Sequence, residues 1–540
     1  MKQNQVERLP SQIKAEPSQP ILYSAVQREQ AAELARRRRA VPASYLFCVI
    51  LAIPLGLLGA LPIWNVEAGA MLILFLSAPL FVGFCILPII YFITKQADIS
   101  IMFVLVCIAY LLYFGLRAYY HVFVPEVVLF PSFDPATDFL YMHRGLLWGT
   151  IGFIGMTLGY MIAGATLKPS QLLKPNLAAR IVFLLDTCSV PGIIIGFYML
   201  GLLGRAYALA TNSASWIYHS PAYDLFATRP DPFIAGPMSL FAEFCPLAFA
   251  ALLAYQYQRQ GGAGASRRLW VVALGMFTIE ITYNIFTTYK FGLLGTFLTL
   301  WLIPIIYRKK FPKWGIILVL VFGAVVFPVT NAMRQDMRTI YSSASAIPNL
   351  EWASQFVETA QGAYADPELD AKYFLDTFIV RLDGAESLAV AEKYLPRYGY
   401  EWGSTYFNLF LLTLPRVLRF GFNDLGYINW EQDYAGMPSY SLTVIPLPVL
   451  VEAYLNFGLV GVLSVMFLIG GFFRLIDVFL LNNPSPLMAG LLLLVFWRML
   501  DIETNLFIVL PALIKTVTVF LVFCWLARQL FLRRLGVQEA

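Results

Sequence analysis

The sequence predicts an all-α polytopic membrane protein with about twelve transmembrane helices and one large helical extracytoplasmic loop. Of its 540 residues, 59% are hydrophobic and only 13% are charged, and the mean hydropathy is +0.68. A soluble core cannot bury that much apolar surface. Apolar runs of about twenty residues recur, a length that crosses roughly 30 Å of hydrocarbon as a helix, and none alternates like a barrel strand. The bilayer is therefore the expected solvent.

The first 40 residues form a polar segment, which we expect to be a disordered cytoplasmic tail and not a cleavable signal peptide. Basic residues end this tail and return at every second boundary between apolar runs, and such residues mark the cytoplasmic side of a membrane protein. Both termini are therefore expected in the cytoplasm. The same topology accounts for the net charge of +5 without a nucleic-acid partner. The basic residues are Arg36, Arg37, Arg38, Arg39, Lys95, Lys168, Lys174, Arg180, Arg259, Arg267, Arg268, Arg308, Lys309, Lys310, Lys313, Arg474, Arg528, Arg533 and Arg534.

The apolar runs predict nine spans within residues 41–331 and three within residues 444–532, followed by a cytoplasmic tail at 533–540. The tenth run is too long for a perpendicular crossing, so we expect a tilt or a kink at Pro446 and Pro448. We find neither a short repeat nor the two-halves symmetry of many transporters. The spans lie near 45–63, 68–94, 99–121, 144–166, 179–203, 237–257, 269–288, 291–307, 314–331, 445–476, 487–505 and 508–529.

Residues 332–443 form the only candidate domain, a loop expected on the outer (periplasmic) side of the membrane. One helix should begin at Asp366 as N-cap, with a proline at the first helical position, and run towards Gly384. A second should follow Ser404 as N-cap. Its sequence is so apolar that we expect it to rest on the outer leaflet until Pro415.

Ionisable residues inside apolar spans are costly, so their depth is informative. In the predicted topology Glu280 is the deepest, although it still lies in the outer half. The others lie near helix ends, where snorkelling to the interface is the simple explanation. Their shared bias still favours an outward-facing polar site. Those near outer ends are Arg117, Arg205, Glu243, Lys290, Arg334, Glu452, Asp501 and Glu503.

Metal and histidine chemistry find no support in the sequence. The three histidines, His121, His143 and His219, stand apart, and all six cysteines lie in apolar runs. The pair Glu431 and Asp433 has a spacing that can hold a divalent metal, but such acidic triplets are common by chance. We therefore expect no metal and no cofactor.

Lys290 opens a helix after a very short turn, where a cation opposes the helix dipole. That placement is favourable if a phosphate binds the free backbone N–H groups and the ammonium together; a snorkelling lysine is the alternative. Arg381 lies late in the helix expected from Asp366, and Arg416 follows Pro415, where the apolar loop helix should end. The guanidinium groups of both arginines can bind diphosphate oxygens bidentately. The alternatives are ordinary structural roles. Arg381 can form a surface ion pair with Glu386, and the charge of Arg416 is favourable at a helix C-terminus.

Glu452 has Asn456 one helical turn on, so both polar groups share a face at the outer end of the tenth span. The carboxylate can act as a general base on an acceptor hydroxyl, or it can bond structurally to Asn456 and the loop. Arg498 and Asp501, spaced i,i+3, favour an internal ion pair over a functional role.

With these residues in place, the sequence resembles the Wzy-type O-antigen and oligosaccharide repeat-unit polymerases of bacterial envelopes. The likeness covers roughly Thr287 to Glu503 and rests on four short motifs. They are the turn at Lys290 before Phe-Gly-Leu-Leu, the Arg381 segment, the stretch from Gly403 to Arg416, and Glu452-Ala-Tyr-Leu-Asn-Phe-Gly-Leu-Val-Gly461. The chain departs from the family in carrying Tyr289 and Phe291 beside Lys290, where relatives often carry small residues.

The resemblance implies a GT-C-like glycosyltransferase in the bacterial inner membrane that acts on the periplasmic face. It would polymerise undecaprenyl-diphosphate-linked oligosaccharides, as both donor and acceptor, into O-antigen, capsule or exopolysaccharide, without a nucleotide sugar or a required metal. Membrane lipids surround it, and a chain-length regulator and a flippase are candidate partners. Arg381 and Arg416 would stabilise the departing diphosphate, and Glu452 would orient or deprotonate the acceptor hydroxyl. The diphosphate-binding candidates are Lys290, Arg334, Arg338 and Arg498.

Two other functions stay open. An O-antigen ligase shares the donor but usually relies on a loop histidine, and residues 332–443 contain none. A lipid-linked glycan flippase or another transporter is the alternative from a different class. It should tolerate exchange of Arg381 or Arg416 for lysine if it needs only the charge.

Overall fold

The computed structural model describes residues 101–124, 130–134, 137–166, 177–211, 232–259, 266–287, 290–308, 384–414, 430–434, 447–482, 485–500 and 506–534, with single residues or short pieces at 72–85, 379, 382 and 436. Helices account for 91% of what is described, and no strand occurs there. The all-α class is therefore confirmed for this part of the chain. The predicted spans near 45–63 and 314–331 lie outside it.

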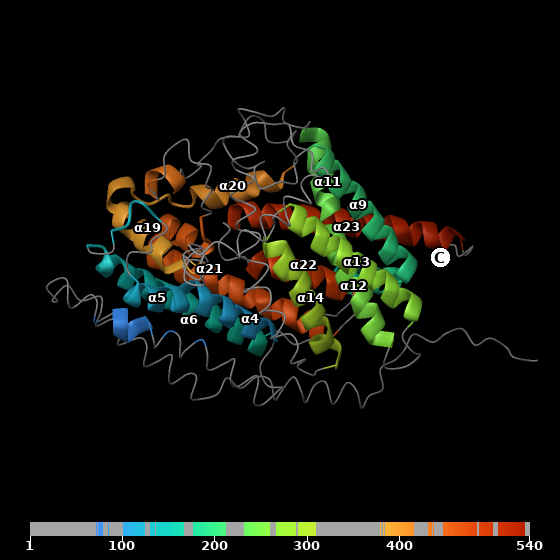
Figure 1. The fold of residues 1–540 in the computed structure, drawn as a ribbon, viewed down its shortest axis with the longest axis horizontal. Helices are drawn as coiled ribbons and strands as arrows, with labels where there is room; N and C mark the ends of the chain where they lie inside the picture. Colours follow the sequence, from blue (N-terminus) through green and yellow to red (C-terminus); the bar gives the residue numbers. More distant parts are fainter. Residues whose placement is uncertain are drawn as a thin grey trace, which may run out of the picture.

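The first half of the described chain supplies the elements α4 (Ile101–Tyr110), η1 (Leu111–Leu116), α5 (Arg117–Phe123), α6 (Phe139–Thr166), α8 (Leu177–Cys188), α9 (Pro191–Ala210), α11 (Pro232–Ala242), α12 (Phe244–Arg259), α13 (Arg267–Phe286) and α14 (Lys290–Arg308). The second half supplies α19 (Gly384–Tyr398), α20 (Ser404–Thr413), η5 (Trp430–Tyr434), α21 (Val449–Asn482), α22 (Pro486–Leu500) and α23 (Leu506–Arg534). Figure 1 shows α4, α5, α6 and α21 on one side of the molecule, and α9, α12, α13, α14 and α22 on the other.

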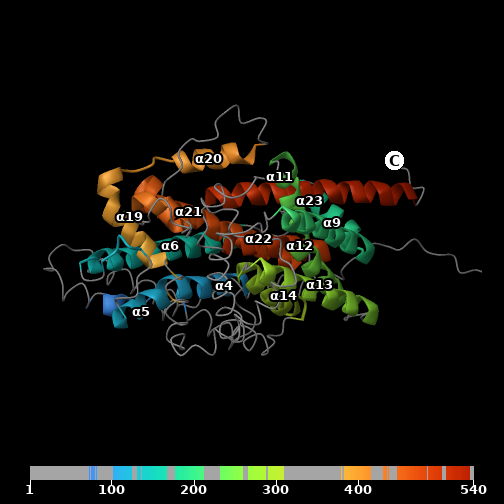
Figure 2. The same cartoon turned by 45° about the horizontal axis from the view of Figure 1, so that its top comes forward.

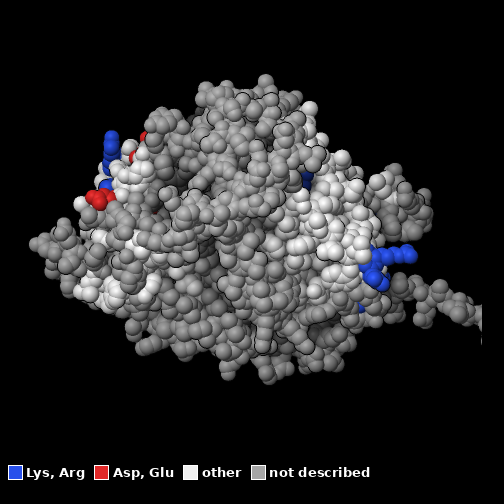
Figure 3. All heavy atoms as spheres, in the orientation of Figure 1, with Lys and Arg blue, Asp and Glu red and all other residues white. Residues whose placement is uncertain are grey.

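Six helical segments of the described chain are long and apolar enough to cross a membrane, and two shorter apolar helices, Gly292–Tyr307 and Pro486–Leu500, accompany them. Among the described residues, Figure 3 shows Asp, Glu, Lys and Arg at the α19 end and Lys and Arg at the opposite end. Apolar helices of this length are what a protein embedded in a bilayer requires. The six segments are Phe103–His121, Phe139–Gly164, Pro191–Ala210, Ile234–Arg259, Val449–Leu480 and Val509–Leu530.

The structure differs from the sequence predictions about helix continuity in two places. The span expected at 179–203 is broken between α8 and α9, because Val190 is extended (φ −106°, ψ 136°) and Pro191 begins a new helix. The tenth span does not kink at Pro448, which precedes α21. Its backbone leaves helical geometry at Phe457 and Gly458, where φ of Gly458 is +61°. The break in helical hydrogen bonding therefore lies at a glycine with positive φ, and not at a proline.

The tightest packing is the crossing of α6 with α21, which lie side by side in both ribbon views (Figures 1 and 2). A Cβ added to Gly159 would lie 1.9 Å from the carbonyl oxygen of Phe467, and one added to Gly470 would lie 1.9 Å from that of Met156. Glycines on both helices therefore let the two backbones touch. Lipid offers no hydrophobic drive for helices to associate, so such close dispersion contacts stabilise the pair, together with the hydrogen bond from the Tyr160 hydroxyl of α6 to Asp477 of α21.

The loop helices α19 and α20 pack on the membrane helices near α21 (Figures 1 and 2). The helix expected from Asp366 towards Gly384 lies outside the described residues, and the structure instead begins a helix at Gly384. The expected second helix is present. Its N-cap is Gly403 (φ +90°) and not Ser404, whose hydroxyl donates to Glu401 Oε2 at 2.9 Å. A left-handed glycine turns the chain more sharply than a serine cap could.

Candidate functional site

The described part of the predicted site lies at one end of the helix bundle. Arg498 lies in the last turn of α22, and α23 begins a few residues later at Leu506. The backbone N–H of Leu506 donates to Glu452, so Arg498 and Glu452 are linked through this short connection. The first residue of α14 is Lys290, and the start of that helix lies beside Arg498, because Gly292 and Arg498 line one cavity. The structure describes the backbone of Lys290 but not its side chain. Arg381, Arg416, Arg334 and Arg338 lie outside the described residues.

Glu452 is fully buried in the first turn of α21. Its Oε2 accepts a hydrogen bond of 2.7 Å from the backbone N–H of Leu506, the first residue of α23. The carboxylate therefore faces the positive end of a second membrane helix, where an anion is stabilised by about 0.3–2 kcal/mol. Structure and sequence agree that an acid belongs at this end of the tenth span. The partner of its side chain is another helix, which the sequence did not indicate.

Asn456 fastens the loop to this helix. Its Nδ2 donates to Thr405 Oγ1 and to the Glu452 backbone carbonyl, each at 2.7 Å, and its Oδ1 accepts from the Gly403 N–H at 2.9 Å. The side chain thus ties the start of α20 to α21 from a fully buried position. The structural alternative raised for Glu452, a bond to Asn456, is present as the bond from Asn456 to the Glu452 backbone carbonyl.

The glycine that breaks α21 belongs to the same junction. A Cβ on Gly458 would lie 3.1 Å from the Tyr400 hydroxyl oxygen, in addition to the strain of its positive φ. Gly461 is also constrained, since a Cβ there would lie 2.2 Å from the Ala453 carbonyl oxygen. The motif from Glu452 to Gly461 therefore supplies a carboxylate, an amide and the backbone shape that seats the α19–α20 turn.

Three ion pairs hold α19 against the membrane helices. Glu386 is fully buried, pairs with Arg117 of α5, and accepts from the Phe130 N–H at 3.1 Å. The expectation that Glu386 takes part in a surface pair is therefore wrong, since its helix packs inward. The other two pairs are Arg144 Nη1 with Glu392 Oε1 at 2.9 Å and Lys393 Nζ with Asp138 Oδ2 at 2.6 Å.

Burial also affects the titration of Glu392. Burial raises the pKa of its carboxyl above the ordinary value, and the hydrogen bonds from Arg144 and from Trp148 Nε1 (2.6 Å) oppose the shift in part. Close backbone contact makes the burial possible. A Cβ on Gly145 would lie 2.4 Å from the Ala385 carbonyl oxygen, and one on Gly384 would lie 2.8 Å from the Phe114 ring.

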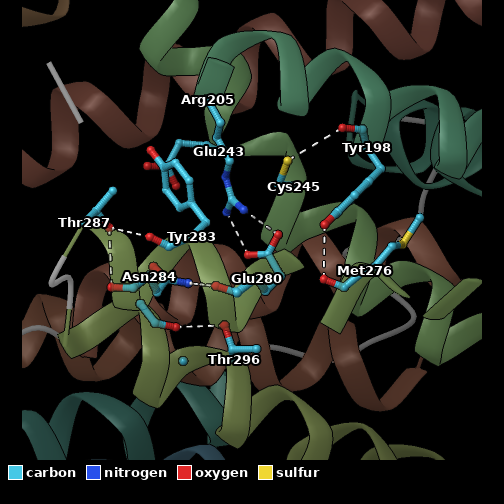
Figure 4. A network of polar contacts seen from close by, with 12 residues as sticks. Tyr198, Arg205, Glu243, Cys245, Met276, Glu280, Tyr283, Asn284, Thr287 and Thr296 are labelled. Carbon is cyan, nitrogen blue, oxygen red and sulfur yellow. Dashed lines mark hydrogen bonds and ion pairs between the residues drawn. The ribbon is translucent and has the colours of Figure 1, made fainter. Parts of the chain in front are cut away.

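A second polar centre lies between α9 and α13 (Figure 4). Arg205 binds Glu280 through two hydrogen bonds of 2.7 Å, and its guanidinium carbon lies 4.2 Å from the centre of the Tyr283 ring. The arginine and glutamate side chains are only 7% and 1% exposed. Each was visible in the sequence as a charge within a span. Their pairing was not, because 75 residues separate them.

Arg498 pairs with Glu243, at the break between α11 and α12. The sequence favoured Asp501 as its partner, and Asp501 lies outside the described residues. Both ion pairs, Arg205 with Glu280 and Arg498 with Glu243, border one cavity of about 180 Å³ enclosed by α9, α12, α13, α14 and α22. No cluster of potential metal ligands occurs among the described residues. What the cavity offers is charge, hydroxyls and aromatic surface.

No protein-family model, no curated protein and no solved structure matches this chain.

Proposed function

We propose that the chain is a membrane glycosyltransferase that polymerises lipid-diphosphate-linked oligosaccharides on the outer face of the membrane. The observation that carries this proposal is the position of Glu452. Its carboxylate lies fully buried where the loop helix α20, the start of α21 and the start of α23 meet. An acid enclosed at that junction, and oriented by the Leu506 N–H, is suited to receiving a proton from a substrate hydroxyl.

The chemistry assigns a role to each candidate. The acceptor hydroxyl oxygen attacks the anomeric carbon of the donor sugar, the bond from that carbon to the diphosphate oxygen breaks, and the hydroxyl proton passes to Glu452. The leaving lipid diphosphate carries the negative charge away from the reacting carbon. Arg381, Arg416 and Lys290 would neutralise it, with Arg334 and Arg338 as further cations, whereas Arg498 already has its charge paired with Glu243.

The attachment of the loop supports the proposal further. Three ion pairs fix α19, and Asn456 fixes α20, so the segments that adjoin Arg381 and Arg416 start and end on anchored helices. A transferase needs such fixed geometry, because a reacting group displaced by about 1 Å can lose about a hundredfold in rate. The exposed apolar side chains of α20, Phe407 (57%) and Phe410 (64%), suit a helix that rests on lipid.

The test is deletion of the gene, gel analysis of the surface glycans, and rescue with variants. Loss of long chains with single repeats retained is the expected deletion phenotype. Glu452→Gln should fail to rescue it although the protein is folded, because the glutamine oxygen can still accept from Leu506 but cannot take the proton. Arg381→Ala and Arg416→Ala should also fail.

The matched control is Glu401→Gln. Glu401 lies in the turn between α19 and α20. Its backbone N–H donates to the Leu455 carbonyl of α21 at 3.0 Å, so this acid adjoins the helix that carries Glu452. Its rescue should be complete. Full rescue by Glu452→Gln would refute the proposed site. Accumulation of repeat units on the cytoplasmic face would replace the polymerase with a flippase, and loss of polymer from the lipid A core alone would indicate a ligase.

A further inference from the structure

The cavity bordered by the two ion pairs has a lining with its own chemistry. On α14 its lining residues are Gly292, Gly295, Thr296 and Thr299, which recur at helical spacing and so share one face of the helix. Opposite them stand Trp497 of α22 and Asn284 of α13. The two glycines leave room that side chains would otherwise fill. One face of α14 therefore presents open space at its two glycines and hydroxyl groups at its two threonines to the cavity.

The polar atoms of this face are mainly acceptors. Thr296 Oγ1 donates to the Gly292 carbonyl at 2.8 Å, Thr299 Oγ1 donates to the Gly295 carbonyl at 2.7 Å, and Asn284 Nδ2 donates to the Glu280 carbonyl at 2.8 Å. The hydroxyl protons of both threonines and one amide proton of Asn284 are thus used within their own helices, and the lone pairs of the side-chain oxygens remain for a ligand. One buried donor completes the set. Arg205 Nε has no acceptor in the part of the chain that the structure describes.

Aromatic surface borders the same space. A Cβ on Gly295 would lie 3.9 Å from the Trp497 ring, so α14 comes no closer to the indole than ordinary contact. Tyr283 lines the cavity too, under the guanidinium of Arg205. A flat aromatic face beside several hydrogen-bond acceptors is complementary to a molecule that has an apolar face and a rim of hydroxyl groups.

Charge and size narrow the class of ligand. Arg205 is paired with Glu280 and Arg498 with Glu243, so the charged side chains described in the lining balance. A neutral ligand meets no uncompensated charge there. At about 10–15 Å³ per water, the 180 Å³ of the cavity holds roughly a dozen waters. One hexopyranose has about as many heavy atoms, whereas an entire oligosaccharide is several times larger.

We propose that this cavity binds a single neutral pyranose ring over Trp497, with sugar hydroxyls donating to Thr296, Thr299 and Asn284. The inference rests on the proposed function, in which that ring is one sugar of the lipid-linked repeat unit. It adds a sugar subsite between the membrane helices, apart from the carboxylate at Glu452.

The test uses the full-length protein in lipid nanodiscs and saturation-transfer NMR. The probes are glucose, galactose, N-acetylglucosamine and rhamnose, one at a time, with mannitol as an acyclic control and inorganic diphosphate as an anionic one. At least one pyranose should bind saturably, and the two controls should not. The double variant Thr296→Val/Thr299→Val should weaken binding by about tenfold or more, since it removes two acceptors and keeps the shape.

Thr516→Val is the matched control, because Thr516 is equally buried, makes the same bond to the carbonyl four residues earlier, and lies on α23 away from the cavity. Gly295→Val should abolish binding by filling the space, whereas Gly295→Ala should fold as the wild type does. Binding by no pyranose, binding by diphosphate, or equal weakening by Thr516→Val would each overturn the inference.

The two proposals fail separately. If deletion of the gene shortens the glycan but no pyranose binds, the sugar subsite is wrong and the polymerase stands. If a pyranose binds through Thr296 and Thr299 while deletion leaves the glycan unchanged, the cavity binds sugar but the polymerase is wrong.

Discussion

Replacing Glu280 by alanine leaves Arg205 buried without its counter-ion, and this perturbation tests the second polar centre most directly. The pair is joined by two bonds of 2.7 Å, and the arginine and glutamate side chains are 7% and 1% exposed. Breaking a buried pair by removing one partner costs about 3–5 kcal/mol, because the remaining charge is neither solvated nor paired. Glu280→Ala and Arg205→Ala should each lower the free energy of unfolding by about that amount. In Glu280→Ala, where the arginine remains, its contact with the Tyr283 ring offsets only about 1–2 kcal/mol of this loss.

The assay is steric trapping in lipid nanodiscs, which measures the unfolding free energy of a membrane protein in its bilayer. The double variant Arg205→Ala/Glu280→Ala should lose far less unfolding free energy than the sum of the two single losses, because it leaves no buried charge. Arg144→Ala is the control. It removes a pair whose arginine side chain is 29% exposed, and it should cost about 1 kcal/mol or less.

One result would refute the reasoning. If Glu280→Ala and Arg205→Ala each cost under about 1 kcal/mol, as an exposed pair does, then water reaches the pair and it is not buried. Additive losses in the double variant would lead to the same conclusion, since they would show that the two side chains do not interact.

Three further predictions follow from the packing, the loop attachment and the titration of Glu392. Gly159→Val should destabilise the protein by about 1–3 kcal/mol or more, because its Cβ would lie 1.9 Å from the Phe467 carbonyl oxygen, whereas Gly196→Val on α9, with nothing within 4 Å, should cost under about 1 kcal/mol; equal thermal midpoints would contradict the α6–α21 contact. Asn456→Ala should speed amide hydrogen exchange across α20, since three hydrogen bonds are lost, while Thr413→Val, whose hydroxyl bonds only within α20, should not; unchanged exchange would show that the loop is held elsewhere. Burial raises the pKa of the Glu392 carboxyl above 4.5 in the native state, so the native state binds this proton more tightly than the unfolded chain does, and the resulting stabilisation is present below about pH 4.5 and is lost as the pH rises through the native pKa. Subtracting the pH profile of the Glu392→Gln melting temperature from that of the wild type should isolate this loss, and identical profiles would show that Glu392 titrates normally.

Several parts of the candidate site could be read from the sequence because they are local. Glu452 and Asn456 are four residues apart, so their shared helix face follows from helical geometry alone. The apolar helix of the loop was visible as an uncharged run, and the structure has it at Ser404–Thr413. Helix breaks were harder to predict. A proline announces a break by its chemistry, whereas a glycine within a helix does not, and the break of α21 at Gly458 is visible only in its backbone angles.

The ion pairs could not be predicted from the sequence. Arg117 and Glu386 are 269 residues apart, and Arg498 and Glu243 are 255 apart. Depth in a span indicates that a charge needs a partner, but it does not identify the partner. The i,i+3 rule pointed Arg498 towards Asp501, because short separations are the only ones a single sequence makes visible.

Composition and the length of the apolar runs determined by themselves that the protein is helical and embedded in a membrane. The physical reason is that hydrocarbon offers no hydrogen-bond partners, so a spanning segment must satisfy its backbone groups internally, as a helix does. They also placed an acid at the start of the tenth span. The tertiary structure alone decided which charges neutralise each other, that α19 and α20 are fastened to the bundle, and that Thr296, Thr299 and Trp497 share a cavity with two ion pairs. These arrangements depend on which helices lie side by side, and helix neighbours are selected by the close fit of glycine and small residues across the whole bundle, a property that no single segment contains.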